Sequence, residues 1–143
     1  MDKIKVLFVC VHNSGRSQIA EAFLKKFGGA HFEVVSAGLT PTAINPLAIE
    51  VMKESGIDIS KNESKGVFEL YKQNKLFHYV ISVCDEARQK CPKFPGLLTK
   101  YLVWSFEDLE ALEGTHEDKL EKARKIRDDI KTAVENFVRH ANN

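Results

Sequence analysis

Hydrophobic and polar positions follow two different periods along the chain, and the two periods alternate. Short apolar runs rich in β-branched and aromatic residues are typical of buried strands, whereas apolar positions three and four residues apart are typical of amphipathic helices. These patterns predict strands at residues 4–9, 32–36, 77–83 and 101–104, and helices at 17–28, 46–56, 67–74 and from 116 onward. Alternating strands and helices favour an α/β fold, with a four-stranded parallel sheet flanked by helices on both faces.

Capping signals support three of these helices. Ser17 is an N-cap candidate for the first helix, and Asn45-Pro46 supplies an N-cap and a proline at the first helical position of the second. Residues Thr115 to Asp118 resemble a capping box before the last helix. These signals fix where the loops between strands and helices end.

Three chemically notable segments directly follow predicted strands. Cys10 follows the first strand, Cys84 follows the third, and residues 104–108 follow the fourth. Because ligand sites of parallel sheets form at the carboxyl ends of the strands, we expect these segments to meet at one edge of the sheet.

Length, charge and cysteine content narrow the class of protein. The 143 residues fit one domain, expected over residues 1–143, and nothing suggests more than a monomer. A net charge of +1 gives no signature of nucleic-acid binding. The apolar run near the N-terminus is too short for a signal peptide or a membrane span, so we expect a cytoplasmic protein. Three cysteines in a reducing compartment favour chemistry or inert burial over a structural disulfide framework.

The segment from Cys10 to Ser17 has the pattern of an oxyanion cradle. Five residues separate the Cys10 thiol from the Arg16 guanidinium at a predicted strand-to-helix junction. Such a loop can turn backbone N–H groups inward, the next helix adds its positive N-terminus, and an arginine can bind two oxygens of a tetrahedral anion. The same field lowers the pKa of a thiol, so we expect Cys10 to be a nucleophilic thiolate near neutral pH. The expected anion-binding loop comprises Val11, His12, Asn13, Ser14, Gly15 and Arg16.

Individual loop residues carry further expectations. No Gly-Lys-Ser/Thr follows, which excludes a Walker-type nucleotide loop, and Cys10 with His12 is a poor ligand set, so no catalytic metal is expected. Besides capping the helix, the Ser17 hydroxyl can stabilise the thiolate, and Asn13 tolerates a left-handed backbone. His12 either lines the pocket or points to solvent, and we favour the second.

Breaking a bond to a poor oxygen leaving group requires a proton donor near the thiolate. Asp108 is the candidate general acid, and Glu107 is its competitor. The alternative is that both are ordinary surface carboxylates.

Cys84 and Cys91 form a second constellation. Seven residues of helix rise by about 10.5 Å, whereas the Cα atoms of bonded cysteines lie within about 7 Å. If the segment is helical when reduced, a Cys84–Cys91 disulfide therefore requires it to unwind, and the nearby Pro92 and Pro95-Gly96 favour a loosely held segment. Three thiols at one edge suggest a relay; the alternative is two unrelated buried cysteines.

With these residues the chain resembles the thioredoxin-coupled arsenate reductases, which share the fold of the low-molecular-weight tyrosine phosphatases. The resemblance implies a phosphatase-like sheet with flavodoxin-like winding and no bound cofactor. The loop alone indicates the superfamily, and the Cys84/Cys91 pair separates reductase from phosphatase. The matching segments are residues 10–18, Ser36-Ala37-Gly38, Asn45-Pro46, Cys84, Cys91-Pro92, residues 104–108 and residues 124–130.

The resemblance also implies a mechanism. Cys10 would attack arsenate held by Arg16 and the loop amides, and Asp108 would protonate the departing oxygen. Cys84 would attack the Cys10–arsenic adduct, releasing arsenite and leaving a Cys10–Cys84 disulfide. Cys91 would convert this bond to Cys84–Cys91, which reduced thioredoxin would reduce, although a glutaredoxin system stays open as the donor. Phosphate or sulfate would compete as oxyanions.

The chain departs from the family pattern at two loop positions. Where the family usually has Asp-Pro, this chain has Asp108-Leu109, and we expect this to loosen the loop around the acid. Some members carry an extra cysteine where this chain has Gly15, so one unproductive oxidation site is removed.

A third departure concerns a structural cation site. Some members bind potassium through residues matching Asn13, Glu21 and Ser36 and an aspartate that Lys65 replaces here. The hypothesis is that the Lys65 ammonium takes the place of the cation, so that activity is insensitive to potassium.

Two other functions compete with arsenate reduction. A low-molecular-weight protein tyrosine phosphatase would use Cys10, Arg16 and Asp108, with water resolving the covalent intermediate. That family usually has an Asp-Pro-Tyr motif late in the chain, which is absent here, although weak phosphatase activity is expected from the shared geometry of arsenate and phosphate. The third candidate is a non-enzymatic redox or oxyanion sensor.

Overall fold

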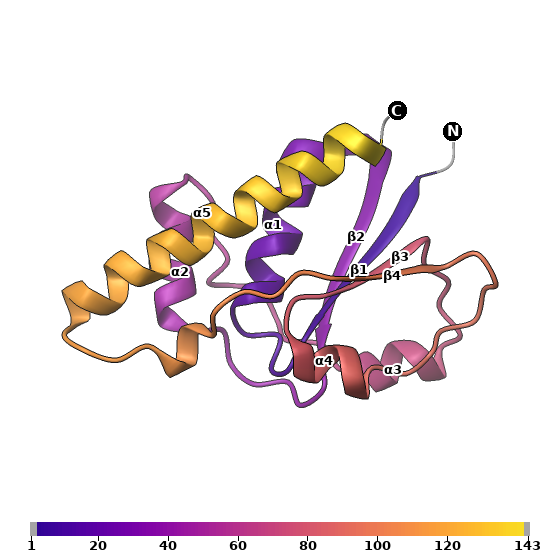
Figure 1. The fold of residues 1–143 in the computed structure, drawn as a ribbon, viewed down its shortest axis with the longest axis horizontal. Coiled ribbons are helices and arrows are strands. Elements are labelled where there is room, and N and C mark those ends of the chain that lie inside the picture. The colour runs from indigo at the N-terminus through magenta and orange to yellow at the C-terminus, as the bar shows by residue number, and fades with distance from the viewer. Residues whose placement is uncertain (1–2, 142–143) are drawn as a thin grey trace.

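The computed structural model describes residues 3–141, and its centre is a four-stranded parallel sheet in the order β2-β1-β3-β4 (Figure 1). The strands are β1 (Ile4–Cys10), β2 (Phe32–Gly38), β3 (Tyr79–Ser82) and β4 (Lys100–Val103). β1 pairs with β2 over its full length, from Ile4 opposite Phe32 to Cys10 opposite Gly38. The predicted sheet is confirmed; residues 1–2 and 142–143, the ends of the domain expected over 1–143, lie outside the described residues.

Helices cover both faces of the sheet, as the alternation predicts (Figure 1). One face carries the larger helices and the other carries the two short ones. The larger helices are α1 (Arg16–Gly28), α2 (Pro46–Glu54) and α5 (His116–Ala141); the short helices are α3 (Val67–Lys72) and α4 (Asp85–Lys90); the 3-10 turns are η1 (Gly29–His31) and η2 (Leu109–Ala111). No helix within residues 3–141 is both long and apolar enough to cross a membrane.

The hydrophobic core explains this arrangement. β1 is a central strand covered on both faces, so Val6 to Val9 form a continuous apolar run with no exposed surface. α1 turns Ile19, Phe23 and Leu24 into the core, and α5 lies along α1. The helical periodicity of α5 places its buried residues on one face, namely Leu120, Ala123, Ile126, Ile130 and Val134.

Two of the three predicted helix starts are confirmed. The Asn45 side chain accepts a hydrogen bond from the backbone N–H of Leu47 at 2.8 Å. Thr115 and Asp118 exchange two reciprocal 3.1 Å bonds before α5.

The prediction that Ser17 caps α1 is wrong. Gly15 precedes the helix, no side chain caps it, and Ser17 lies in the first turn, where its hydroxyl contacts Cys10. The N-terminal N–H groups of α1 therefore have no capping side chain, which suits a helix end that receives an anion.

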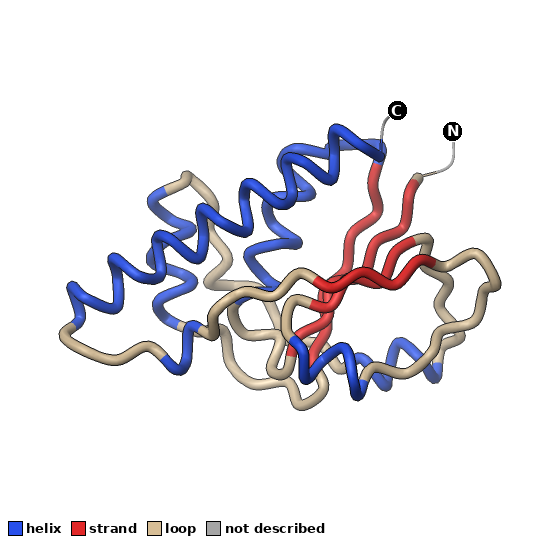
Figure 2. The backbone as a smooth tube through the Cα atoms, in the orientation of Figure 1, coloured by secondary structure: helices blue, strands red, loops and turns tan. Residues whose placement is uncertain are grey.

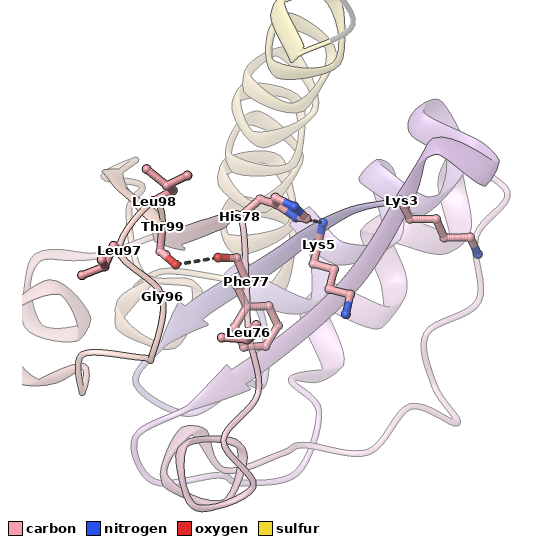
Figure 3. A pocket seen from close by; sticks show the side chains of 9 residues that line it. All are labelled: Lys3, Lys5, Leu76, Phe77, His78, Gly96, Leu97, Leu98 and Thr99. Carbon is pink, nitrogen blue, oxygen red and sulfur yellow. Dashed lines mark hydrogen bonds between the residues drawn. The ribbon is translucent and has the colours of Figure 1, made fainter. Parts of the chain in front are cut away.

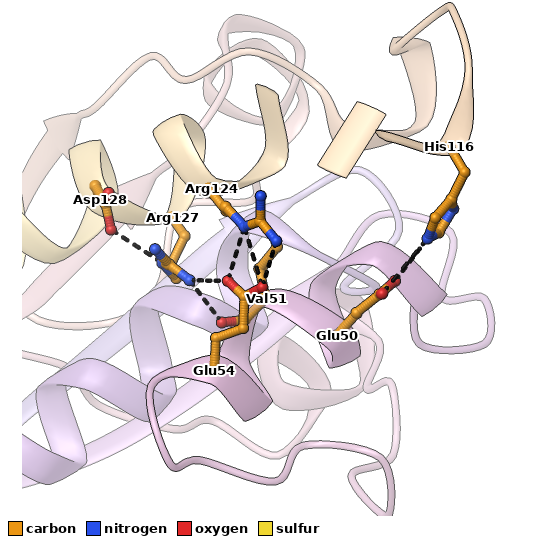
Figure 4. A network of polar contacts seen from close by, with 7 residues as sticks. All are labelled: Glu50, Val51, Glu54, His116, Arg124, Arg127 and Asp128. Carbon is orange, nitrogen blue, oxygen red and sulfur yellow. Dashed lines mark hydrogen bonds and ion pairs between the residues drawn. The ribbon is translucent and has the colours of Figure 1, made fainter. Parts of the chain in front are cut away.

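An ion-pair network joins α2 to α5 (Figure 4). Glu54 of α2 accepts a two-pronged contact from Arg124 at 2.8–3.1 Å and a further bond from Arg127 at 2.7 Å. Arg127 also donates to the Val51 carbonyl at 2.9 Å. Hydrogen bonding to Arg124 lowers the pKa of Glu54, so the carboxylate is held in its charged form.

Candidate active site

The loops that follow the strands gather at the carboxyl ends of the sheet (Figure 2). The loop of residues 10–16 is held there by backbone hydrogen bonds from the chain after β2: Leu39 to Cys10, Thr40 to Val11, Thr42 to His12 and Asn45 to Ser14, at 2.8–3.1 Å. β2 ends tightly against this loop, because a Cβ atom on Gly38 would lie 2.7 Å from the backbone of His12 and Asn13. The backbone of the cradle is therefore held in place by the end of β2 and the chain that follows it.

The Cys10 thiol lies at the base of the loop and is 3% exposed. Its Sγ is 2.8 Å from the Ser17 hydroxyl and accepts a hydrogen bond from the backbone N–H of Asn13 at 3.1 Å. Both groups stabilise a negative charge on sulfur, so the arrangement is that of a nucleophile.

Asn13 organises the loop from inside the core. It has φ 53°, in the left-handed region, as its residue type predicts. Its side-chain amide donates to the hydroxyls of Ser17 and Ser36 at 2.8 and 2.9 Å, and its Oδ1 accepts from the backbone of Lys65 at 2.8 Å. Asn13 is fully buried, so it fixes the loop and the Ser17 hydroxyl, and it does not line the cavity above Cys10.

Arg16 connects the cradle to the segment after β4. Its Nη1 donates to the Phe106 carbonyl at 3.0 Å, and its Nη2 lies 3.8 Å from Oδ1 of Asp108. Asp108 lines the cavity above Cys10, whereas Glu107 is exposed and does not. Of the two candidate acids, the geometry favours Asp108.

The cavity above Cys10 is small. It has about 10 Å³ of free volume, about the space of one water molecule. Its walls are Cys10, His12, Ser14, Gly15, Arg16, Asn45, Asp108, Leu109 and Glu110. Val11 and Asn13, which were expected among the anion-binding residues, contribute no wall to it, although a backbone N–H of Asn13 reaches the thiol.

A much larger cavity lies at the opposite end of the strands (Figure 3). It has a volume of about 620 Å³, and its lining includes Lys5 and His78 beside the exposed Leu97 and Leu98. Lys5 is five residues before Cys10 on β1, which separates the two places by roughly 16 Å. We assign the chemistry to the small cavity, because it contains the thiol.

Two residues at the mouth of the small cavity differ from expectation. His12 does not simply point to solvent: its Nδ1 is 3.1 Å from the Thr40 carbonyl and its Nε2 is 3.7 Å from Glu110. Glu110 was not predicted at all, yet its Oε1 accepts a 2.9 Å bond from Ser14. The two partners are 96 residues apart in sequence, and no local pattern indicates the contact.

The loosening of the acid loop expected from Asp108-Leu109 stays a prediction, but Leu109 itself is well packed. Leu109 is 3% exposed, and a Cβ atom on Gly15 would lie 2.8 Å from its Cδ1. The absence of a side chain at Gly15 thus gives Leu109 the space in which it anchors the loop. Asp108 then caps η2 by accepting a 3.0 Å bond from the Glu110 N–H.

The Lys65 hypothesis is wrong in its geometry. The Lys65 ammonium bonds the Glu63 carbonyl at 3.3 Å, whereas Glu21 receives the ammonium of Lys25 at 2.9 Å. Lys25 follows Glu21 by one helical turn, so a local pair supplies the positive charge. Asn13 and Ser36 bond each other, as described above. Insensitivity to potassium stays a prediction.

Cys84 lies beside the cradle. β1 pairs with β3 up to Val9 opposite Ser82, and the Val83 N–H bonds the Val9 carbonyl at 2.9 Å. Cys10 and Cys84 therefore follow directly after the last contact of two adjacent strands, and both are buried. Continuing this register puts Cys10 opposite Val83, so Cys84 lies one residue beyond the position that faces Cys10, on a chain segment about 4.8 Å away.

Cys91 lies at the far end of α4. The helix spans Asp85–Lys90 between the two cysteines, and Ala87 is its buried residue. Burial raises the pKa of the Cys91 thiol to about 11, with a smaller opposing effect from Lys93. All three cysteines are free, so this is the geometry of the reduced protein, with Cys91 held as a neutral thiol.

Comparison with known proteins agrees with the predicted family and fold. The family of low molecular weight phosphotyrosine protein phosphatases matches residues 5–143. The arsenate reductase of Halalkalibacterium halodurans is 38% identical over 139 residues, covering 96% of this chain and 97% of that protein. The arsenate reductase of Bacillus subtilis is 35% identical over 138 residues, covering 96% of this chain and 97% of that protein.

Solved structures of arsenate reductases and of a tyrosine phosphatase have the same fold as this chain. An arsenate reductase in its oxidised state superposes with a TM-score of 0.79 at 33% identity, covering 95% of this chain and 97% of that one. A thioredoxin-dependent arsenate reductase of Corynebacterium glutamicum gives a TM-score of 0.70 at 30% identity, covering 98% of this chain and 62% of that one. A low molecular weight protein tyrosine phosphatase of T. tengcongensis gives 0.77 at 25% identity, covering 96% and 99%. The chain therefore belongs to the low-molecular-weight phosphotyrosine protein phosphatase family, alongside relatives that are arsenate reductases.

Proposed function

We propose that this protein reduces arsenate to arsenite by a three-cysteine relay, with thioredoxin as the electron donor. One observation carries the proposal: Cys10 is the last residue of β1, Cys84 follows the adjacent strand β3 by two residues, and Cys91 lies one short helix away from Cys84. A phosphatase needs only the first of these thiols. The names of relatives at 35–39% identity support the same reaction.

The first step is attack by Cys10 on arsenate. Arg16, the loop N–H groups and the N-terminus of α1 bind the oxyanion and balance its charge. The Cys10 thiolate, stabilised by Ser17 and the Asn13 N–H, forms a sulfur–arsenic bond. Asp108 protonates the departing oxygen, which leaves as water.

The second step transfers two electrons to arsenic. The Cys84 thiolate attacks the Cys10 sulfur, and a disulfide forms between them. The sulfur–arsenic bond breaks with its electron pair moving to arsenic, so As(V) becomes As(III) and leaves as arsenite. The two cysteines together supply the two electrons.

The third step moves the disulfide toward the surface. Cys91 attacks Cys84, and Cys10 leaves as a thiolate ready for another cycle. Seven residues of helical rise between Cys84 and Cys91 amount to about 10.5 Å, which is too far for a disulfide, so α4 must unwind before the bond forms. Ala87 is the one buried residue of α4, so unwinding costs little free energy.

We expect the unwinding of the segment after Cys84 to stop at Phe94. This side chain is 4% exposed, it packs edge-on against Phe77 at 5.2 Å, and its N–H bonds the Tyr101 hydroxyl at 2.9 Å. We therefore expect rearrangement between Val83 and Phe94, which carries Cys91 out of its buried position. There its pKa falls toward the ordinary value and its thiolate becomes available. Reduced thioredoxin then reduces the Cys84–Cys91 disulfide.

A single-turnover experiment tests the relay. The Cys91→Ser variant, mixed with arsenate, is expected to release one arsenite per protein and then stop, with a Cys10–Cys84 disulfide in the peptide map. The Cys84→Ser variant should release none. Catalytic arsenate reduction by Cys84→Ser with thioredoxin would contradict the relay.

Phosphate-ester hydrolysis is the second candidate function. The same cradle and acid suit a phosphoryl group, and the fold superposes on a tyrosine phosphatase with a TM-score of 0.77. We propose weak side activity of this kind. It should survive in Cys84→Ser and vanish in Cys10→Ser, as measured by hydrolysis of an aryl phosphate.

A further inference from the structure

Glu110 separates two hollows at the active edge. Together with Asn45 and Leu109, it lines both the small cavity above Cys10 and an adjoining groove of about 590 Å³. The groove lies between α2 and the start of α5, and its other walls include apolar Ile44, Leu47 and Leu112 and the polar side chains Glu50, His116 and Lys119. Figure 4 shows Glu50 and His116 facing each other on this side of the molecule.

The position of the Glu110 side chain is fixed at several points. Its Oε1 accepts a 2.9 Å bond from Ser14, and its Oε2 lies 3.7 Å from Nε2 of His12. Its backbone N–H bonds Asp108, and the neighbouring Leu109 is buried. The carboxylate is thus held across the rim of the cradle between the loop of Cys10 and the loop of the acid.

We propose that Glu110 is a specificity-determining residue that narrows the cradle toward the groove, admitting small inorganic oxyanions and disfavouring phosphate monoesters. The inference rests on the proposed function only in that the cradle binds oxyanions. A free oxyanion brings only its own oxygens into the cradle. The organic group of a bound ester must also extend outward through the rim of the cradle. The groove that could receive this group lies on the other side of Glu110.

Two effects of Glu110 act together against an ester. Its side chain occupies the passage, which is a steric effect. Its negative charge at the rim opposes the entry of any oxyanion, inorganic or ester, so the discrimination between the two is steric. Replacement by glutamine removes the charge and keeps the volume and the acceptor for Ser14, whereas replacement by alanine removes all three.

Aryl phosphate hydrolysis and phosphate binding test the proposal without thioredoxin. We compare the wild type, Glu110→Ala, Glu110→Gln and a control, Glu113→Ala, which removes an exposed carboxylate outside both hollows. The probes are p-nitrophenyl phosphate for kcat and KM, and inorganic phosphate for binding by calorimetry. Thermal unfolding checks that each variant is folded.

Glu110→Ala is expected to raise kcat/KM for the aryl ester about tenfold, through a lower KM. Phosphate affinity should change by less than this factor, and Glu113→Ala should match the wild type. Glu110→Gln should give a smaller gain than alanine, because the passage stays filled. An aryl-ester kcat/KM within twofold of the wild type in Glu110→Ala, with phosphate still bound, would overturn the proposal. Failure of arsenate reduction is measured separately and would count against the proposed function alone.

Discussion

At the scale of single residues, the chemistry depends on how each of the three thiols is held. Cys10 has two donors within 3.1 Å and lies at a helix N-terminus, whereas Cys91 is half-buried beside a backbone carbonyl. The cysteines, Arg16 and the stabilising role of the Ser17 hydroxyl can be predicted from sequence, because their spacing at a strand end carries the information. Glu110 and the orientation of His12 cannot, because they depend on a contact between distant segments.

The Ser17 hydroxyl is expected to sustain the reactivity of Cys10. A hydrogen bond to a charged group contributes about 1.5–3 kcal/mol, so Ser17→Ala should slow alkylation of Cys10 by iodoacetamide at pH 7 by about tenfold or more. The measurement is made with Cys84 and Cys91 replaced by serine. Ser60→Ala, at an exposed position, is the control. An unchanged alkylation rate in Ser17→Ala would show that the hydroxyl does not stabilise the Cys10 thiolate.

The raised pKa of Cys91 predicts a loss of stability in alkali. Its ordinary value is 9.0 and its value in the fold is about 11, so below pH 9 the thiol is neutral in both the folded and the unfolded chain. Between pH 9 and 11 the unfolded chain loses the proton first, and the free energy of unfolding falls. Two units correspond to at most ~2.7 kcal/mol, which partial exposure of the thiol reduces to about 1–2 kcal/mol.

Urea unfolding of reduced protein at pH 7.5 and 10.5 measures this effect. The Cys91→Ser variant cannot titrate at this position and should lose correspondingly less stability over the same interval. Identical losses in the two proteins would show that Cys91 is not protected by burial.

At the scale of elements, the cradle is the loop that connects β1 to α1, and the end of β2 packs against it. The strands, the order of helices and the capping of α2 and α5 follow from local patterns, so sequence predicts them. The start of α1 cannot be predicted in this way, because the Ser17 hydroxyl bonds a thiol and not the helix backbone. The firm anchoring of Leu109 depends on the absence of a side chain at Gly15, a relation between two segments that neither shows alone.

Gly38 tests how closely β2 supports the cradle. In Gly38→Ala the new Cβ atom would meet backbone atoms at 2.7 Å, which cannot rotate away, so the loop must shift. A shift of this size should lower kcat/KM for arsenate by about 100-fold. Gly66→Ala is the matched control, because its Cβ would find ordinary contacts at 3.7 Å. Equal activity of the two variants would contradict a tightly braced cradle.

At the scale of the whole molecule, α5 spans from the rim of the groove to the far end of the sheet and is joined to α2 by the Glu54 network (Figure 4). The amphipathic pattern predicts that α5 packs on the sheet layer. It does not predict Glu54 as the acceptor of two arginines, because the partners are 70 and 73 residues away. The Lys65 hypothesis failed for a different reason: Lys25 lies one helical turn after Glu21, a local spacing that the hypothesis did not consider.

The network predicts acid sensitivity. The pKa of Glu54 lies below its ordinary 4.5 in the fold, so its contribution to stability is present above that value and is lost as pH falls through the lowered pKa. Between pH 6 and 3, Glu54→Gln should therefore lose less stability than the wild type in urea unfolding. Glu121→Gln, an exposed position on α5, should behave like the wild type. If Glu54→Gln and the wild type lose stability in parallel, the network does not join the helices.

The most direct test of the three-cysteine relay is NADPH oxidation by the protein with thioredoxin and thioredoxin reductase, before and after arsenate is added. If the relay operates, arsenate-dependent turnover is expected in the wild type, and no sustained turnover is expected in Cys91→Ser. No turnover by the wild type, in a protein that still hydrolyses an aryl phosphate, would contradict the relay and favour the phosphatase.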